Sequence, residues 1–188
     1  MDFTPLHPKI VHIPLALAVI LPIQNIALSL SWWRQWLPRR VWLISACLHA
    51  VMTLGAFVAM QTGESEEHIA ERVVSKHEIH EHEEAAELFL WASVVALLLA
   101  LVAAIAEKEK QGLQFAVAST VISIICTFLA VEAGDHGGKL VYKYGAGRAF
   151  SPAKYGGVAD VPRSADEKDS DHHSDEHHDS DHDSDESH

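Results

Sequence analysis

Histidine is the residue type in this sequence with the widest chemistry, because imidazole ligates haem iron, zinc and copper and is costly against lipid. Eight of the 14 histidines precede residue 150, and only His49 lies within an apolar segment. The other seven lie at one end of four apolar segments: His7, His12, His68, His77, His80, His82 and His136. This pattern predicts a layer of imidazoles at one membrane face, which favours a binding site there.

The elements that must position this layer are four apolar segments, at residues 11–31, 41–61, 85–107 and 113–133. Each has about 20 residues, the length that crosses a hydrocarbon core of roughly 30 Å as a helix. We therefore predict an all-α integral membrane four-helix bundle over residues 1–150, with both termini on one side. The first segment has no basic leader or small-residue cleavage site, so it is not expected to be a cleavable signal peptide. Gln24 and Asn25 are expected to face the bundle, since lipid offers them no partner.

Residues 151–188 form a second region of low complexity, rich in Asp, Ser and His. From residue 160 onward there are twelve acidic and two basic residues, so most of the net charge of −12 lies there and the helical region is nearly neutral. The composition predicts a disordered acidic tail, and the lack of a basic surface argues against a nucleic-acid partner. Candidate ligands for zinc, nickel or copper in the tail are His172, His173, His177, His178 and His182. A solvated polyanion explains the tail equally well.

Four histidines of the layer are candidate cofactor ligands. His12, His82 and His136 each lie within one helical turn, about 5.4 Å, of the end of a predicted span. His7 is expected to fold over the same level from a segment that Pro8 keeps extended. These four imidazoles are suited to ligate b-type haem axially, or to supply three or four ligands to zinc or copper. They are equally well suited to act as hydrogen-bonded caps and solvated ion pairs at helix ends.

The segment Glu64–Glu84 is acidic and helix-prone, and it is either an extension of the third span or a separate surface helix. Its pair His77 and His80 has a spacing that can chelate a divalent ion, although an exposed charged face is favoured. After Gly134 the sequence becomes glycine-rich, which predicts turns and irregular structure.

His49 lies about 15 Å from the layer by helical rise, too deep to join it. Three roles are open for it: a second haem ligand, a residue on a proton path, or a core histidine bonded to a neighbouring helix. The last of these is the default.

The opposite end of the predicted bundle carries tryptophans and closely spaced cations. Trp32, Trp33, Trp36 and Trp42 are expected to form an interfacial aromatic belt. Arg and Lys are denser in the two short connections at this end than in the longer segments at the other end, which favours it as cytoplasmic. The histidine layer and both termini are then expected outside the cytoplasm, in a bacterial inner membrane.

Four motifs in order resemble a family of bacterial membrane proteins, domain of unknown function 2231. Leu6-His7-Pro8-Lys9-Ile10-Val11-His12-Ile13-Pro14 is similar to its L-H-P-x-x-V-H-F-P signature, with Ile13 in place of Phe. Thr62-Gly63-Glu64 and His82-Glu83-Glu84-Ala85 follow, and Gly137-Gly138-Lys139-Leu140-Val141-Tyr142 with Gly145 is similar to G-G-x-L-V-Y-x-x-G. The resemblance covers roughly residues 3–150 and implies four membrane helices. Relatives joined to Rieske or c-type cytochrome modules imply a redox setting.

Together these features predict a membrane protein that binds b-type haem or a redox metal for electron transfer, without catalysis on a small substrate. Redox partner proteins or a second copy of the chain are possible partners besides the bilayer. The alternatives are handling of divalent transition metals, through transport or buffering by the tail, and a purely structural membrane subunit. The glycine-rich stretch lacks the sequence of a P-loop or a dinucleotide fold, so nucleotide-driven chemistry is not supported.

Overall fold

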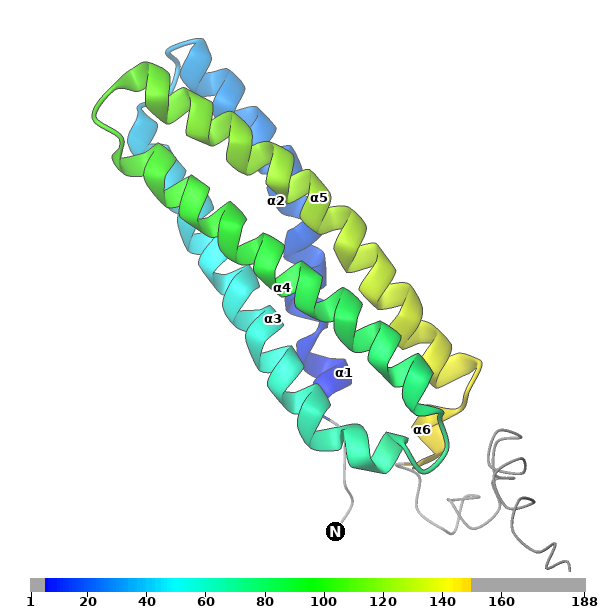
Figure 1. Cartoon of the computed structure of the whole chain (residues 1–188). Helices are drawn as coiled ribbons and strands as arrows, with labels where there is room; N and C mark the ends of the chain where they lie inside the picture. The colour runs from blue at the N-terminus through cyan, green and yellow to red at the C-terminus, as the bar shows by residue number, and fades with distance from the viewer. Residues whose placement is uncertain (1–5, 150–188) are drawn as a thin grey trace, which may run out of the picture.

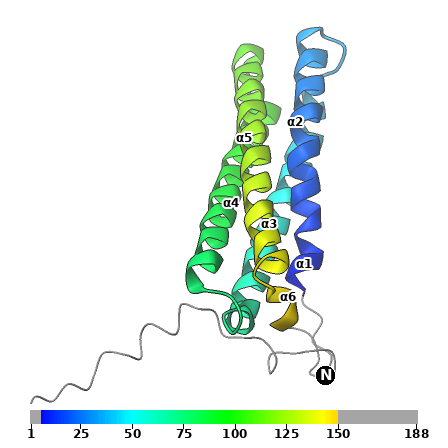
Figure 2. The same ribbon diagram turned by 90° about the vertical axis from the view of Figure 1, so that its right-hand side faces the viewer.

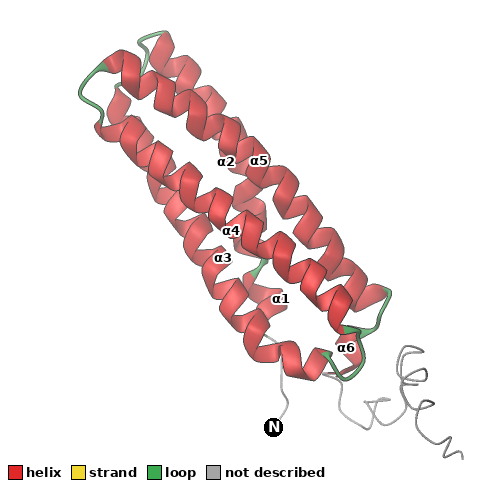
Figure 3. Cartoon of the chain, in the orientation of Figure 1, coloured by secondary structure: helices red, strands yellow, loops and turns green. Residues whose placement is uncertain are grey.

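The structure, a computed structural model, describes residues 6–149. Within that range every regular element is a helix, as Figure 3 shows. In chain order they are α1 (His7–Ile10), α2 (His12–Trp33), the 3₁₀ turn η1 (Arg39–Val41), α3 (Trp42–Ala70), α4 (Lys76–Ile105), α5 (Glu109–Tyr142) and α6 (Ala146–Ala149). Four of the helices are long and apolar enough to cross a membrane, which confirms the predicted all-α membrane bundle. The predicted tail lies outside the described residues.

The four long helices pack as a ring, because each contacts the next along the chain and α5 also contacts α2 (Figure 1). The first and last described residues lie at the same end of this bundle (Figure 2). We call this the histidine end; it comprises residues 6–12, 61–84 and 134–149. The opposite end, with the connections at residues 33–42 and 105–112, is called the tryptophan end.

Three helices extend beyond their predicted spans at the histidine end. The acidic segment Glu64–Glu84 was expected to be either an extension of the third span or a separate surface helix. The structure divides it between the end of α3 and the start of α4, with a turn between them. The irregular structure predicted after Gly134 was wrong, because α5 continues to Tyr142. Its last turn is held by Leu140, which packs on a small cluster with Val74 and Ile79. The glycine signal fits Gly145, whose positive φ of 76° allows the turn into α6.

The bundle interior is built largely from small residues, which allow the helices to approach closely. Leu21, Met52, Phe89 and Cys126 form a core on the histidine-end side. Trp32 and Trp42 form a second core with several alanines at the tryptophan end. The predicted aromatic belt was therefore wrong for these two tryptophans, which are buried; Trp33 and Trp36 are exposed as expected. Both cysteines are free: Cys126 is buried in the first of these cores and Cys47 is exposed.

Between the two cores lies a layer of buried polar side chains. Asn25 is fully buried and faces the bundle, as predicted. His49 is also fully buried, and its Nε2 lies 2.9 Å from the Ser123 hydroxyl of α5. His49 is therefore buried in the core and bonded to a neighbouring helix, which agrees with its default interpretation.

Candidate metal centre at the histidine end

His7 is fastened to the outer part of α3. Its Nδ1 lies 2.7 Å from the main-chain oxygen of Ala59, and the preceding residue, Leu6, donates its N–H to Glu66 Oε1 at 2.7 Å. The ring packs on Gly63, where an added Cβ would lie 3.2 Å from Nδ1. The expected extended segment was wrong: His7 begins the single turn of α1, because Pro8 is tolerated in a first turn where its missing N–H has no role.

His82 is fastened to α5 in the same manner. Its Nδ1 lies 3.0 Å from the main-chain oxygen of Ala133. Its ring packs on Gly137, where an added Cβ would lie 3.1 Å from Cε1. Each of these two histidines therefore bonds a carbonyl on a neighbouring helix and lies against a glycine one turn further along that helix.

These two hydrogen bonds determine where the proton of each neutral imidazole lies. A main-chain carbonyl can only accept, so Nδ1 of His7 and of His82 must carry the hydrogen. The lone pair of a neutral ring is then on Nε2, and no hydrogen bond to either Nε2 occurs within residues 6–149. An Nδ1–H bonded to a backbone carbonyl is the usual outer contact of a histidine that ligates a metal through Nε2.

The structure brings two of the four candidate ligands together. The ring centres of His7 and His82 lie 6.0 Å apart, with the ring planes at 88°. His136 precedes Gly137, on which the His82 ring packs, and its Nδ1 lies 3.6 Å from a carboxylate oxygen of Glu81. His12 is exposed on α2 and makes no polar or ring contact with any described residue. Over residues 6–149, no three His, Cys, Asp or Glu side chains form a group that could hold a metal ion.

The second candidate group, His77 and His80, lies on the exposed outer part of α4. His77 Nε2 lies 3.3 Å from Glu81, and His80 Nε2 lies 3.1 Å from Glu84, so each pairs with a carboxylate one turn further along. This arrangement agrees with the favoured interpretation, an exposed charged face. The tail candidates His172, His173, His177, His178 and His182 lie outside the described residues.

Sequence reasoning missed the roles of three residues at this end. Gly63 and Gly137 provide the surfaces on which the histidine rings lie, and Glu81 is the partner of His136. A glycine inside a helix is costly and usually has a packing reason, so the glycines within helices α3 and α5 were a usable signal. No sequence signal distinguishes Glu81 from its many acidic neighbours.

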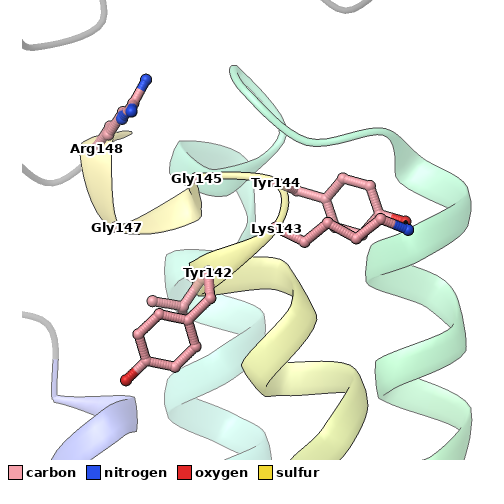
Figure 4. A pocket seen from close by; sticks show the side chains of 7 residues that line it. Tyr142, Lys143, Tyr144, Gly145, Gly147 and Arg148 are labelled. Atoms are coloured by element: carbon pink, nitrogen blue, oxygen red, sulfur yellow. Dashed lines mark hydrogen bonds between the residues drawn. The ribbon is translucent and has the colours of Figure 1, made fainter.

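A surface hollow of about 340 Å³ lies where α5 turns into α6. Its two cations do not converge: Lys143 and Tyr144 extend together on one side, and Arg148 points elsewhere (Figure 4). Lys143 Nζ lies 2.9 Å from the Tyr144 hydroxyl, and this hydrogen bond raises the pKa of the Lys143 ammonium. The divergence of the cations makes the hollow a poor anion site, and no histidine lines it.

The fold and this geometry define a multi-pass membrane protein whose histidines are arranged at one end of a four-helix bundle. Comparison with protein families identifies the group. The chain belongs to the family described as predicted membrane protein (DUF2231), whose model matches residues 3–149. No curated protein matches the chain, and no solved structure matches it.

Proposed function

We propose that this membrane protein binds a transition-metal centre through Nε2 of His7 and Nε2 of His82, and that this centre serves electron transfer at the membrane surface. One observation carries the proposal: both imidazoles give their Nδ1–H to a main-chain carbonyl, and the Nε2 lone pair of each has no partner within residues 6–149. A histidine needed only as a helix cap would gain nothing from a second, free nitrogen held in a half-buried place.

The separation of the rings supports a shared ion. A metal lies about 2.0–2.1 Å from a ligating imidazole nitrogen, hence roughly 3.2 Å from the ring centre, so two rings on one ion have centres at most roughly 6.4 Å apart. The 6.0 Å between His7 and His82 falls within this limit. The same limit applies to a bare ion and to the iron of b-type haem, because either would be held through imidazole nitrogens.

The surroundings support an electron-transfer role over transport. The apolar parts of the four long helices carry no Asp, Glu, Lys or Arg at 42–60, 88–105 or 113–131, and none at 12–33. A transported cation would need charge compensation across the membrane, and these segments offer only neutral polar groups. Handling of divalent metals through the acidic tail remains the alternative. We further propose that the histidine end faces outside the cytoplasm of a bacterial inner membrane.

The test uses the full chain purified in detergent after expression with ample haem and with copper. An absorption spectrum with haem bands identifies the haem centre, and metal analysis of a haem-free preparation identifies a bare copper or iron ion. We expect one centre per chain in the wild type. His7→Ala and His82→Ala should each lower its occupancy at least about tenfold, since each removes one ligand.

His12→Ala is the matched control, because His12 lies near the same level but is exposed and its side chain makes no polar or ring contact with residues 6–149. It should retain the centre of the wild type. A wild-type protein that stays free of haem and metal under both conditions contradicts the proposal, as does equal occupancy in the His7→Ala and wild-type proteins.

A further inference from the structure

Four polar side chains meet between the two core clusters, inside the membrane-spanning part of the bundle. They are Asn25 of α2, Ser45 and His49 of α3, and Ser123 of α5, each at most 1% exposed. Ser45 Oγ lies 2.6 Å from Asn25 Oδ1, and Asn25 Nδ2 lies 3.1 Å from Ser123 Oγ. His49 completes the group, with Nε2 2.9 Å from Ser123 Oγ and Nδ1 2.8 Å from the main-chain oxygen of Ser45. We call these four side chains the polar ring.

When His49 is neutral, the hydrogen bonds of the polar ring form a closed cycle in which every bond is donated in the same direction around the ring. Ser45 donates to Asn25, Asn25 donates to Ser123, Ser123 donates to His49 Nε2, and His49 Nδ1–H donates to the Ser45 carbonyl. A carbonyl cannot donate, so Nδ1 must carry the proton and Nε2 must accept. Each of the four residues then donates one hydrogen bond and accepts one within the ring.

The same heavy-atom positions also satisfy a second state. Ser123 Oγ lies 2.8 Å from the main-chain oxygen of Ser119, one turn back in α5. If His49 Nε2 carries a proton, it donates to Ser123 Oγ, and the Ser123 hydroxyl hydrogen turns to the Ser119 oxygen. The Asn25 and Ser45 bonds are unchanged. Rotation of the Ser123 hydroxyl thus separates two states in which all four residues remain hydrogen-bonded.

We infer that the polar ring is a proton-binding site within the membrane, with His49 as the acceptor and Ser123 as the switching hydroxyl. In the binding step a hydronium ion gives its proton to His49 Nε2 and leaves as water. An N–H bond forms, the Ser123 hydroxyl turns from Nε2 to the Ser119 oxygen, and the site gains one positive charge. No electron is transferred.

Unpartnered polar atoms indicate the side from which the proton arrives. Ser29 Oγ and Trp42 Nε1 are buried without a protein partner and lie one turn from Asn25 and Ser45 toward the tryptophan end. Gln24 Nε2, level with the polar ring, is also unpartnered. Buried polar atoms without a protein partner are usually satisfied by ordered water. Waters bound at these atoms would connect the polar ring to the tryptophan end.

The opposite direction is closed by apolar side chains. Leu21, Met52 and Cys126 are fully buried, and each lies one turn from a member of the polar ring toward the histidine end. Together with Phe89 they form the core that separates the polar ring from His7 and His82. Among the described residues, Thr53 Oγ1 is the one buried side-chain oxygen or nitrogen on this side without a hydrogen-bond partner. We therefore place the entrance at the tryptophan end.

Few other titratable groups face His49. The apolar parts of α2, α4 and α5 packed around α3 contain no Asp, Glu, Lys or Arg, and Cys126 is their only other titratable side chain within two turns of Ser123. Cys47, on α3 itself, is exposed on the outer surface of the bundle. The proton on His49 is consequently held by the neutral dipoles of the polar ring alone.

The experiment is ¹⁵N NMR of the full chain, labelled at histidine and placed in lipid vesicles with a single orientation. A His49→Gln sample identifies the His49 signals by difference. At about pH 8 we expect the neutral form with a protonated Nδ1, and on acidification we expect Nε2 to become protonated as well. The titration should follow the pH on the tryptophan-end side of the vesicle.

Two variants separate a proton site from a merely structural histidine. Ser123→Ala removes the switching hydroxyl and should lower the midpoint of the His49 titration by about one pH unit, a tenfold loss of proton affinity. Ser93→Ala removes a fully buried hydroxyl that bonds only within α4, and should leave the titration unchanged. In folded wild-type protein, an Nε2 that stays unprotonated down to about pH 4.5 overturns the inference. A titration that follows the histidine-end pH overturns it as well.

Discussion

The histidine pair at the bundle end and the polar ring inside the bundle use the same residue type in two ways. In both places the imidazole Nδ1 is bonded to a main-chain carbonyl, at 2.7 Å for His7, 3.0 Å for His82 and 2.8 Å for His49. The difference lies at Nε2. That atom is bonded to Ser123 in His49, whereas in His7 and His82 it has no hydrogen-bond partner among residues 6–149.

This comparison shows that burial alone does not make a histidine a candidate ligand. Deep in the membrane an unpartnered nitrogen would be expensive, so the bundle supplies a hydroxyl. At the end of the bundle, water or an ion is available to an open nitrogen. The two carbonyls at the histidine end also belong to neighbouring helices, so these bonds hold α1 to α3 and α4 to α5.

The largest expected difference between the two regions is in stability. Asn25→Ala deletes a side chain that connects α2 with both α3 and α5, leaving a cavity and a Ser45 hydroxyl without its acceptor. We expect a loss of about 2–4 kcal/mol in the free energy of unfolding. Unfolding in mixed detergent micelles measures it.

Gln24→Ala is the matched control, because Gln24 is adjacent, half-buried and has an unpartnered Nε2. It should cost less than about 1 kcal/mol. Equal losses in the two variants would show that the polar ring contributes no specific bonding.

A smaller effect is expected at the surfaces that position the histidine pair. Gly137→Ala places a methyl group 3.1 Å from His82 Cε1, so the ring must move to relieve this contact, which disturbs its hydrogen bond to the Ala133 carbonyl. We expect metal affinity to fall about tenfold, as is typical when an outer contact of a ligand is lost. Equilibrium binding of copper or haem to the full chain measures this change.

Gly138→Ala is the neighbouring control in the same helix. An added Cβ there meets no atom within 4 Å, so the pair should be undisturbed. Alanine should stabilise α5 by up to about 1 kcal/mol, because glycine is a poorer helix former. A loss of metal affinity as large as that of Gly137→Ala would show that the ring contact is not the cause.

The smallest effect is expected from the tail. Deleting residues 160–188 removes six histidines and twelve acidic residues and leaves in place Ala59 and Ala133, whose carbonyls bond His7 and His82. A centre held by the pair should keep its wild-type occupancy, within about twofold. Metal analysis of the truncated and full-length proteins decides the matter. A large fall in bound metal would favour metal handling by the tail over an electron-transfer centre.

The sequence predicted the four spans because apolar length is a local property that the bilayer thickness selects. It also predicted that Asn25 faces the bundle, since only another helix can satisfy an amide in lipid. Helix ends were predicted less well. The charged residues beyond each span resemble a loop in composition, but packing of Leu140 on Val74 and Ile79 extends the helices past the membrane.

The candidate site shows which features could not be predicted from the sequence. Helical rise placed His7, His12, His82 and His136 at one level, because depth depends only on residue number along a helix. Which of them face each other depends on how each helix is rotated against its neighbours, which no single segment encodes. Only the tertiary structure placed the ring centres of His7 and His82 6.0 Å apart. It also left His12 exposed and paired His136 with Glu81. The sequence determined the depth of each histidine along its helix. The packing of the helices decided which way each ring points, and it laid the rings of His7 and His82 on Gly63 and Gly137.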